Sequence, residues 1–71
     1  MELKTGDRVY NTELGETMEV ELIKTTEGIK PKTEIGTGAE VWLKLAYLHN
    51  GNQTYNWEPR VEVTADKVRS V

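Results

Sequence analysis

The chain has 71 residues, with 12 acidic against 9 basic residues, and its formal net charge of -3 disfavours nonspecific binding to nucleic-acid phosphates. It has no cysteine and a single histidine, His49, which excludes disulfides and a zinc site built from cysteine and histidine ligands. This length fits one domain, residues 1–71, whose stability must come from packing of a small core.

The first expected strand follows a turn at residues 6–7, where a Gly-Asp pair supplies the turn chemistry. In this strand we expect Val9 to face inward and Tyr10 to face outward. Residues 14–16, Leu-Gly-Glu, form the next turn. The start of the chain therefore predicts a short strand between two tight turns.

Residues 17–22 alternate between polar and apolar side chains, which is the pattern of a strand with one solvated face. The expected inward residues are Met18, Val20 and Leu22.

Residues 25–40 have no clean period and offer only Ile29 and Ile35 for burial. We predict a long loop between the second and third strands. Loops of this length in compact domains are usually functional or mobile, and both a binding loop and a solvated excursion fit this composition.

Residues 40–48 alternate again, and we expect a strand with one uniformly apolar face. The inward set is Val41, Leu43, Leu45 and Tyr47, and the outward set is Trp42, Lys44, Ala46 and Leu48.

An Asn-Gly pair at residues 50–51 indicates a hairpin to a fourth strand, whose apolar residues share odd positions. A two-residue turn would set the apolar face of residues 40–48 against polar side chains. A three-residue loop at 49–51 lets both apolar faces agree. This register pairs Leu45 with Tyr55 and Leu43 with Trp57, and it brings Val61 and Val63 onto the same face.

The chain closes with an expected turn at residues 64–67 and a short strand at residues 68–71. Five short strands joined by tight turns predict an all-β fold, namely a small and strongly bent five-stranded barrel.

The motifs Lys4-Thr5-Gly6-Asp7-Arg8-Val9 and Gly15 followed by Met18-Glu19-Val20 resemble the K-x-G-D-x-V and G-x-x-M-x-V patterns of small bacterial SH3-like barrels. The nearest family is that of the YodC-like short proteins, from which this chain departs in its long central loop and in lacking a Trp-Phe pair. The resemblance implies an SH3-like barrel and carries no assigned activity. A fainter similarity is to SH3 domains that bind proline-rich ligands, with Trp42 and Tyr10 as the matching aromatics.

Catalytic chemistry has few candidates in this sequence. The only serine, Ser70, is next to the last residue, and Glu19 and Glu21 share a face that we expect to be solvated. The Gly-Thr-Gly stretch at residues 36–38 lacks the glycine, lysine and helix of a phosphate-binding loop. We therefore expect no enzymatic activity, no cofactor and no metal.

The outward side chains of residues 40–48 give the best candidate for a binding surface. We predict that Trp42, Lys44 and Leu48 bind a protein or peptide partner, with Tyr10 extending the surface. The alternative is that residues 25–40 cover Trp42, or that strand curvature buries it in a second small core. Lys44 is also expected to pair across strands with Glu19 or Glu21.

Two other functions stay open, a nucleic-acid-associated barrel and an accessory subunit of an enzyme complex. The sequence has no apolar stretch long enough for a signal sequence or a membrane span, so we expect a cytoplasmic protein that does not enter membranes. Whether it is a monomer or a weak dimer is left open by the sequence.

Overall fold

The computed structural model describes residues 1–36, 40–48 and 60–71. Within them the chain is built from strands and one 3-10 turn, η1, and none of its helical segments is long and apolar enough to cross a membrane. The all-β prediction is confirmed. In chain order the elements are β1 (Glu2–Lys4), β2 (Arg8–Asn11), β3 (Glu16–Thr25), β4 (Gly28–Lys30), β5 (Lys32–Glu34), β6 (Val41–Tyr47), β7 (Arg60–Thr64), η1 (Ala65–Lys67) and β8 (Val68–Ser70).

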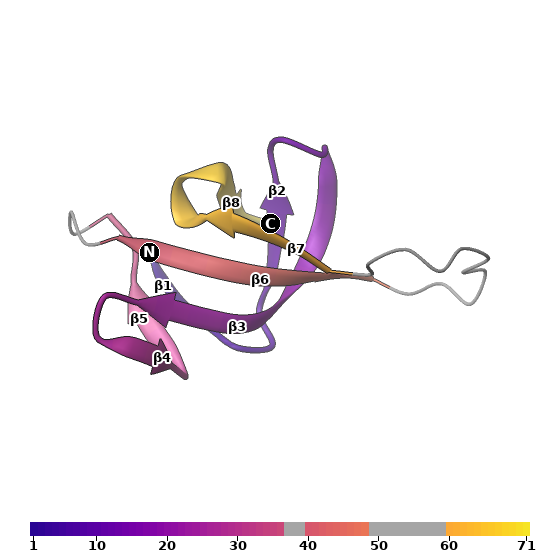
Figure 1. Cartoon of the computed structure of the whole chain (residues 1–71). Coiled ribbons are helices and arrows are strands. Elements are labelled where there is room, and N and C mark those ends of the chain that lie inside the picture. Colours follow the sequence, from indigo (N-terminus) through magenta and orange to yellow (C-terminus); the bar gives the residue numbers. More distant parts are fainter. Residues whose placement is uncertain (37–39, 49–59) are drawn as a thin grey trace.

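All strand pairs are antiparallel, and the main sheet has the order β7-β6-β3-β2-β8 with β4 added to β3 (Figure 1). β1 and β5 form a separate pair. In the described part of the chain β7 and β8 are the two edges of the main sheet, and η1 joins them. The sheet is therefore strongly bent, while the closed five-stranded barrel of the prediction is not observed.

The prediction of a long loop at residues 25–40 is wrong for residues 28–34, which hold β4 and β5. β3 turns directly into β4, where Gly28 has a φ of 114° and accepts a hydrogen bond through its carbonyl from the Thr25 hydroxyl at 3.1 Å. β5 pairs with β1, with Leu3 opposite Thr33. Backbone hydrogen bonds to β1 and β3 hold this segment in place. Ile29 adds little to the core, because it is 67% exposed.

One continuous apolar core takes residues from β1, β2, β3, β6, β7, η1 and β8, with alternate residues buried along β6. Ile35 and Val61 pack against it while partly exposed. The buried apolar residues are Leu3, Val9, Met18, Val20, Ile23, Val41, Leu43, Leu45, Val63, Ala65 and Val68.

A β-bulge at Glu21 divides β3 into two halves of opposite parity. Val20 lies opposite Leu45, but Leu22 lies opposite Lys44, so one extra residue stands on β3. Met18 and Val20 are buried as predicted, whereas the inward position after the bulge belongs to Ile23. The predicted burial of Leu22 is wrong for this reason: it shares the outward face with Lys44 and is only partly buried.

The predicted register of the β6–β7 hairpin is also wrong. Leu45 lies opposite Val61 and Leu43 lies opposite Val63, not opposite Tyr55 and Trp57. The shift is six residues, an even number, so the odd positions still share the inward face. Tyr55, Trp57, His49 and the expected loop at 49–51 lie outside the described residues.

The inward face of β6 is buried only along its first two thirds. Val41, Leu43 and Leu45 are buried as predicted. Tyr47 was expected among them, but it is 40% exposed because it stands at the end of the strand, beyond the cover of the core.

The turn between β2 and β3 is held by Asn11, a fully buried polar residue that the sequence analysis did not single out. Its side-chain oxygen accepts hydrogen bonds from the backbone N–H groups of Glu13 at 2.9 Å and Leu14 at 3.2 Å. Gly15, with a φ of 71°, donates its N–H to the Asn11 carbonyl at 2.8 Å. The predicted turn at residues 14–16 is thus part of an Asn-capped loop.

Candidate functional site

The outward face of β6 presents an indole beside the end of β7. Trp42 lies opposite Lys24 of β3 on one side and Thr64 of β7 on the other. It is partly buried. The Trp42 side chain points outward, because side chains alternate along a strand and both neighbours, Val41 and Leu43, are buried on the inward face.

The 3-10 turn η1 follows β7 at once and returns the chain toward the start of β6. Ala65, the first residue of η1, is buried, whereas Thr64 and Asp66 are exposed. The turn lies where residues 64–67 were predicted to turn, and the following strand β8 lies where residues 68–71 were predicted to be extended.

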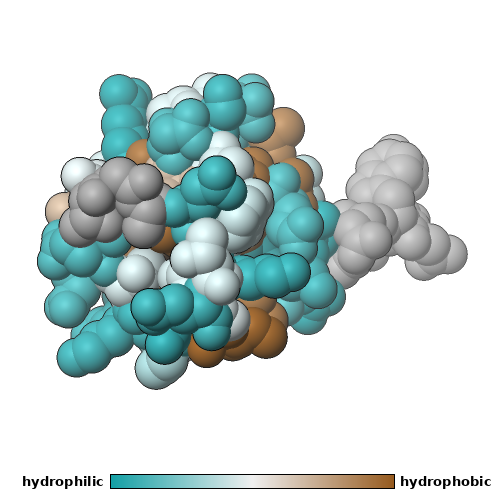
Figure 2. Space-filling view, turned by 60° about the vertical axis from the view of Figure 1, so that its left-hand side comes forward, coloured by the Kyte–Doolittle hydropathy of each residue, from teal (hydrophilic) through white to brown (hydrophobic). Residues whose placement is uncertain are grey.

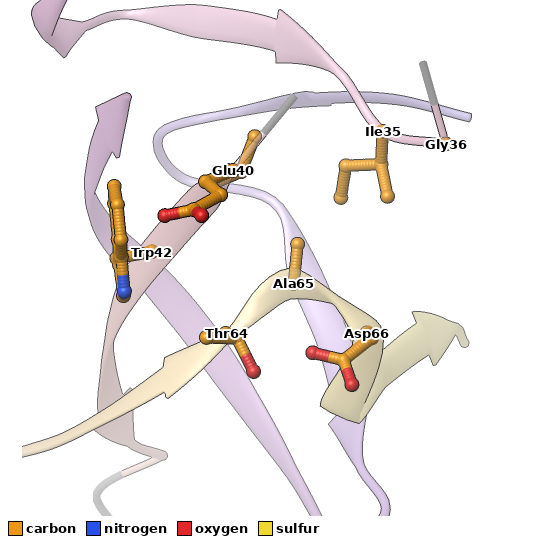
Figure 3. A pocket seen from close by; sticks show the side chains of 8 residues that line it. Ile35, Gly36, Glu40, Trp42, Thr64, Ala65 and Asp66 are labelled. Carbon is orange, nitrogen blue, oxygen red and sulfur yellow. The ribbon is translucent and has the colours of Figure 1, made fainter. Parts of the chain in front are cut away.

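A pocket of about 580 Å³ opens between the start of β6, the end of β5 and η1. Figure 3 shows Trp42 and Ile35 on opposite sides of it, with Ala65 between them. Its volume lies within the range of about 300–1,000 Å³ that is usual for ligand pockets. The lining residues are Ile35, Gly36, Glu40, Val41, Trp42, Thr64, Ala65 and Asp66.

Two carboxylates stand on the rim of this pocket, Glu40 before β6 and Asp66 in η1. A hydrogen bond from the Thr64 hydroxyl lowers the pKa of Asp66, helped by its own backbone N–H and by the nearby charge of Lys67. The first of these causes is the largest. Asp66 is therefore ionised at neutral pH.

The structure separates the four predicted binding residues. Trp42 lines the pocket. Lys44, two residues further along β6, lines a second hollow of about 420 Å³ together with Arg60, Val61 and Glu62. Leu48 follows the end of β6 and is exposed.

Tyr10 lies at the other end of the outward face. Its partner on β3 is Thr17, whereas the partner of Trp42 is Lys24, a separation of about 23 Å along the strand at about 3.3 Å per residue. The guanidinium of Arg69 covers the Tyr10 ring, with its carbon 5.1 Å from the ring centre. Tyr10 is not among the residues that line the Trp42 pocket.

Of the two predicted partners of Lys44, Glu21 does feel its charge, but the main partner of Glu21 is Arg60. Arg60 of β7 binds the Glu21 carboxylate at the β3 bulge. This hydrogen bond is the main cause that lowers the pKa of Glu21, and the charge of Lys44 contributes less. Lys44 itself lies opposite Leu22 and Glu62, and Glu19 lies opposite Ala46.

The face that carries the start of β6 is largely hydrophilic, and apolar residues reach its surface only in separate places (Figure 2). A pocket with apolar walls is therefore a distinct feature here. Within residues 1–36, 40–48 and 60–71 there is no group of three histidine, cysteine, aspartate or glutamate side chains placed to hold a metal ion.

Sequence reasoning found Trp42 but not the other side of the pocket. Glu40 is close to Trp42 in sequence, whereas Ile35 and Asp66 are brought to Trp42 by the β1–β5 pair and by η1. No local pattern marks them, although the turn that carries Asp66 was visible.

Comparison of the chain with family models, with curated proteins and with solved structures gives no match. The pocket beside Trp42 is therefore the main evidence for the function of this protein.

Proposed function

We propose that this protein is a noncatalytic interaction module that binds a peptide segment of a partner protein in the pocket beside Trp42. The observation that carries the proposal is the apolar hollow of about 580 Å³ between Trp42, Ile35 and Ala65. Concave sites with an aromatic wall and a few polar groups are the usual form of a binding site. Tryptophan is also the residue type most enriched where binding energy is concentrated.

We further propose that the fold belongs to the SH3-like class. The strand order β7-β6-β3-β2-β8 and the 3-10 turn between β7 and β8 support this assignment, as do the sequence motifs around Gly6 and Gly15. In this interpretation β4 and β5 are an insertion between two strands of the barrel, and the insertion supplies one side of the binding pocket.

The noncatalytic part of the proposal is supported by the chemistry of the pocket. Its polar side chains are Glu40, Thr64 and Asp66. The lowered pKa of Asp66 makes its carboxylate a weak general base at neutral pH.

The test is affinity capture from a lysate of the source cell with the parent protein and with Trp42→Ala. We expect the partner to be retained by the parent and reduced about 30-fold or more by Trp42→Ala, which corresponds to a loss of about 2 kcal/mol. The matched control is Tyr10→Ala, which removes an aromatic ring from the same face at its other end.

Circular dichroism must show that both variants are folded. Equal capture by the parent and a folded Trp42→Ala variant contradicts the proposal. So does a loss that Tyr10→Ala reproduces to the same extent, because that result would place binding outside the pocket.

A further inference from the structure

We propose that the pocket beside Trp42 takes the side chain of an arginine in a basic peptide segment. This inference rests on the proposed peptide-binding function and adds the chemistry of the residue that is bound. It starts from the charges of the lining residues, which are all of one sign: Glu40 and Asp66 are the two charged groups among the residues described around the pocket.

Two lysines lie near the pocket, and the charge of Lys67 contributes to the lowered pKa of Asp66, but neither lysine is among the residues described around the pocket. Lys24 is opposite Trp42 on β3 but does not line the hollow. Lys67 follows Asp66, and its ammonium group lies 3.9 Å from the Glu13 carboxylate, on the side of the β2–β3 turn. The pocket is therefore negative at its rim and apolar along its walls.

An arginine side chain matches both properties. Its three methylene groups can lie along Ile35 and Ala65, and its planar guanidinium can stack on the indole of Trp42. The same guanidinium has five N–H donors for two carboxylates, and hydrogen bonds between ionised groups are the strongest class available. The pocket thus provides a partner for each part of the arginine side chain.

Other occupants match less well. An apolar side chain would take water away from Glu40 and Asp66 without giving them a hydrogen bond, which costs free energy. An acidic segment would be repelled by both carboxylates and by the net charge of -3. Lysine would satisfy the charge, but its ammonium group cannot stack as a plane on the indole.

Two other hollows of the described residues carry charges of both signs. One of about 240 Å³ contains both signs, and its Lys30 is paired with Glu27 at 3.4 Å. The hollow beside Lys44 also has both signs. The Trp42 pocket differs from these two hollows in that its charged lining residues, Glu40 and Asp66, have one sign.

The experiment is an NMR titration of the isotopically labelled protein with two blocked heptapeptides of glycine and leucine. One has a central arginine, and the other has citrulline, which has the same shape without the charge. We expect the arginine peptide to shift the amide signals of Trp42 and Ala65 and to bind about tenfold more tightly than the citrulline peptide, a ratio that corresponds to about 1.4 kcal/mol.

Two double variants separate the pocket charges from the overall charge. Glu40→Gln with Asp66→Asn should remove the preference for arginine over citrulline. Glu16→Gln with Glu19→Gln changes the net charge equally at exposed positions of β3 outside the pocket and should keep the preference. All four side chains are exposed, so both variants are expected to fold.

The outcomes distinguish this inference from the function on which it rests. Equal binding of both peptides at the pocket overturns the arginine inference and leaves peptide binding intact. Absence of any shift at Trp42 and Ala65, with capture from lysate still dependent on Trp42, has the same meaning. Absence of the shift together with capture that does not depend on Trp42 overturns both.

Discussion

The two faces of β6 differ in what surrounds them, although they belong to one seven-residue strand. On the inward face Val41, Leu43 and Leu45 are buried against β3 and β7. On the outward face Trp42 and Lys44 are only partly buried, and each borders a hollow. In so small a chain the core depends on one face of this strand, and the other face is left partly open to solvent.

The largest expected effect tests the inward face. Leu43→Ala removes a fully buried side chain and should lower the free energy of unfolding by about 2–5 kcal/mol, because the packed core cannot close the space. Urea denaturation followed by circular dichroism measures this loss. Leu43→Met, which conserves volume, should cost less than about 1.5 kcal/mol. Equal stability of the alanine variant and the parent would show that this face is not the core.

The second largest effect is expected at Asn11, a polar residue that is fully buried. Asn11→Ala leaves the N–H groups of Glu13 and Leu14 without their acceptor and should lower the free energy of unfolding by about 1–3 kcal/mol. Thermal unfolding provides the measurement. The control is Thr12→Ala, an exposed neighbour whose hydroxyl donates to the Lys67 carbonyl at 2.8 Å and which should cost less. The reverse order would contradict a structural role for Asn11.

Trp42→Ala sharpens the comparison from the outward face. Trp42 is larger than Leu43 but lies partly in solvent, so its truncation should lower the free energy of unfolding by only about 1–2 kcal/mol. Urea denaturation under the conditions used for Leu43→Ala gives the two values side by side. A larger loss for Trp42→Ala than for Leu43→Ala would assign the indole to the core and weaken the proposed pocket.

The smallest effect depends on pH. Arg60 lowers the pKa of Glu21 below its usual value of 4.5, so the pair adds stability above pH 4.5 that is lost as the pH falls through the lowered value. Glu21→Gln should therefore slightly reduce the melting temperature at pH 7 and leave it unchanged near pH 2. Glu19→Gln removes the same charge two residues away and should have a weaker effect at pH 7. A difference between parent and Glu21→Gln that grows in acid would contradict this assignment.

The alternation of apolar residues predicted the strands β2, β3 and β6 and most of their buried positions, because a side chain must point to one face or the other, but it missed β4 and β5. It predicted Val9, Met18 and Leu45 as buried, and all three are. It did not determine the β6–β7 register, since a shift of six residues preserves parity and leaves the same faces in contact. It also did not reveal the bulge at Glu21, which costs one residue and has no sequence signal of its own.

The site was predictable only where it depends on one strand. Trp42 was expected to point outward because its neighbours point inward. The other side of the pocket depends on the pairing of β5 with β1, two strands that are far apart in the sequence. It also depends on the position of η1 against β6. Such placements come from tertiary structure, and a single sequence does not encode them in any local pattern. The same reason explains the distance between Tyr10 and Trp42.

The pairing of β2 with β8 joins Val9 to Ser70, so the main sheet contains strands from nearly opposite ends of the sequence. During synthesis β2 emerges from the ribosome long before its second neighbour exists. Val9 must stay partly uncovered until residues 68–70 have also emerged, and the sheet can close only afterwards. Closure of the main sheet is thus expected to wait for residues 68–70, at a rate limited by contacts between distant residues.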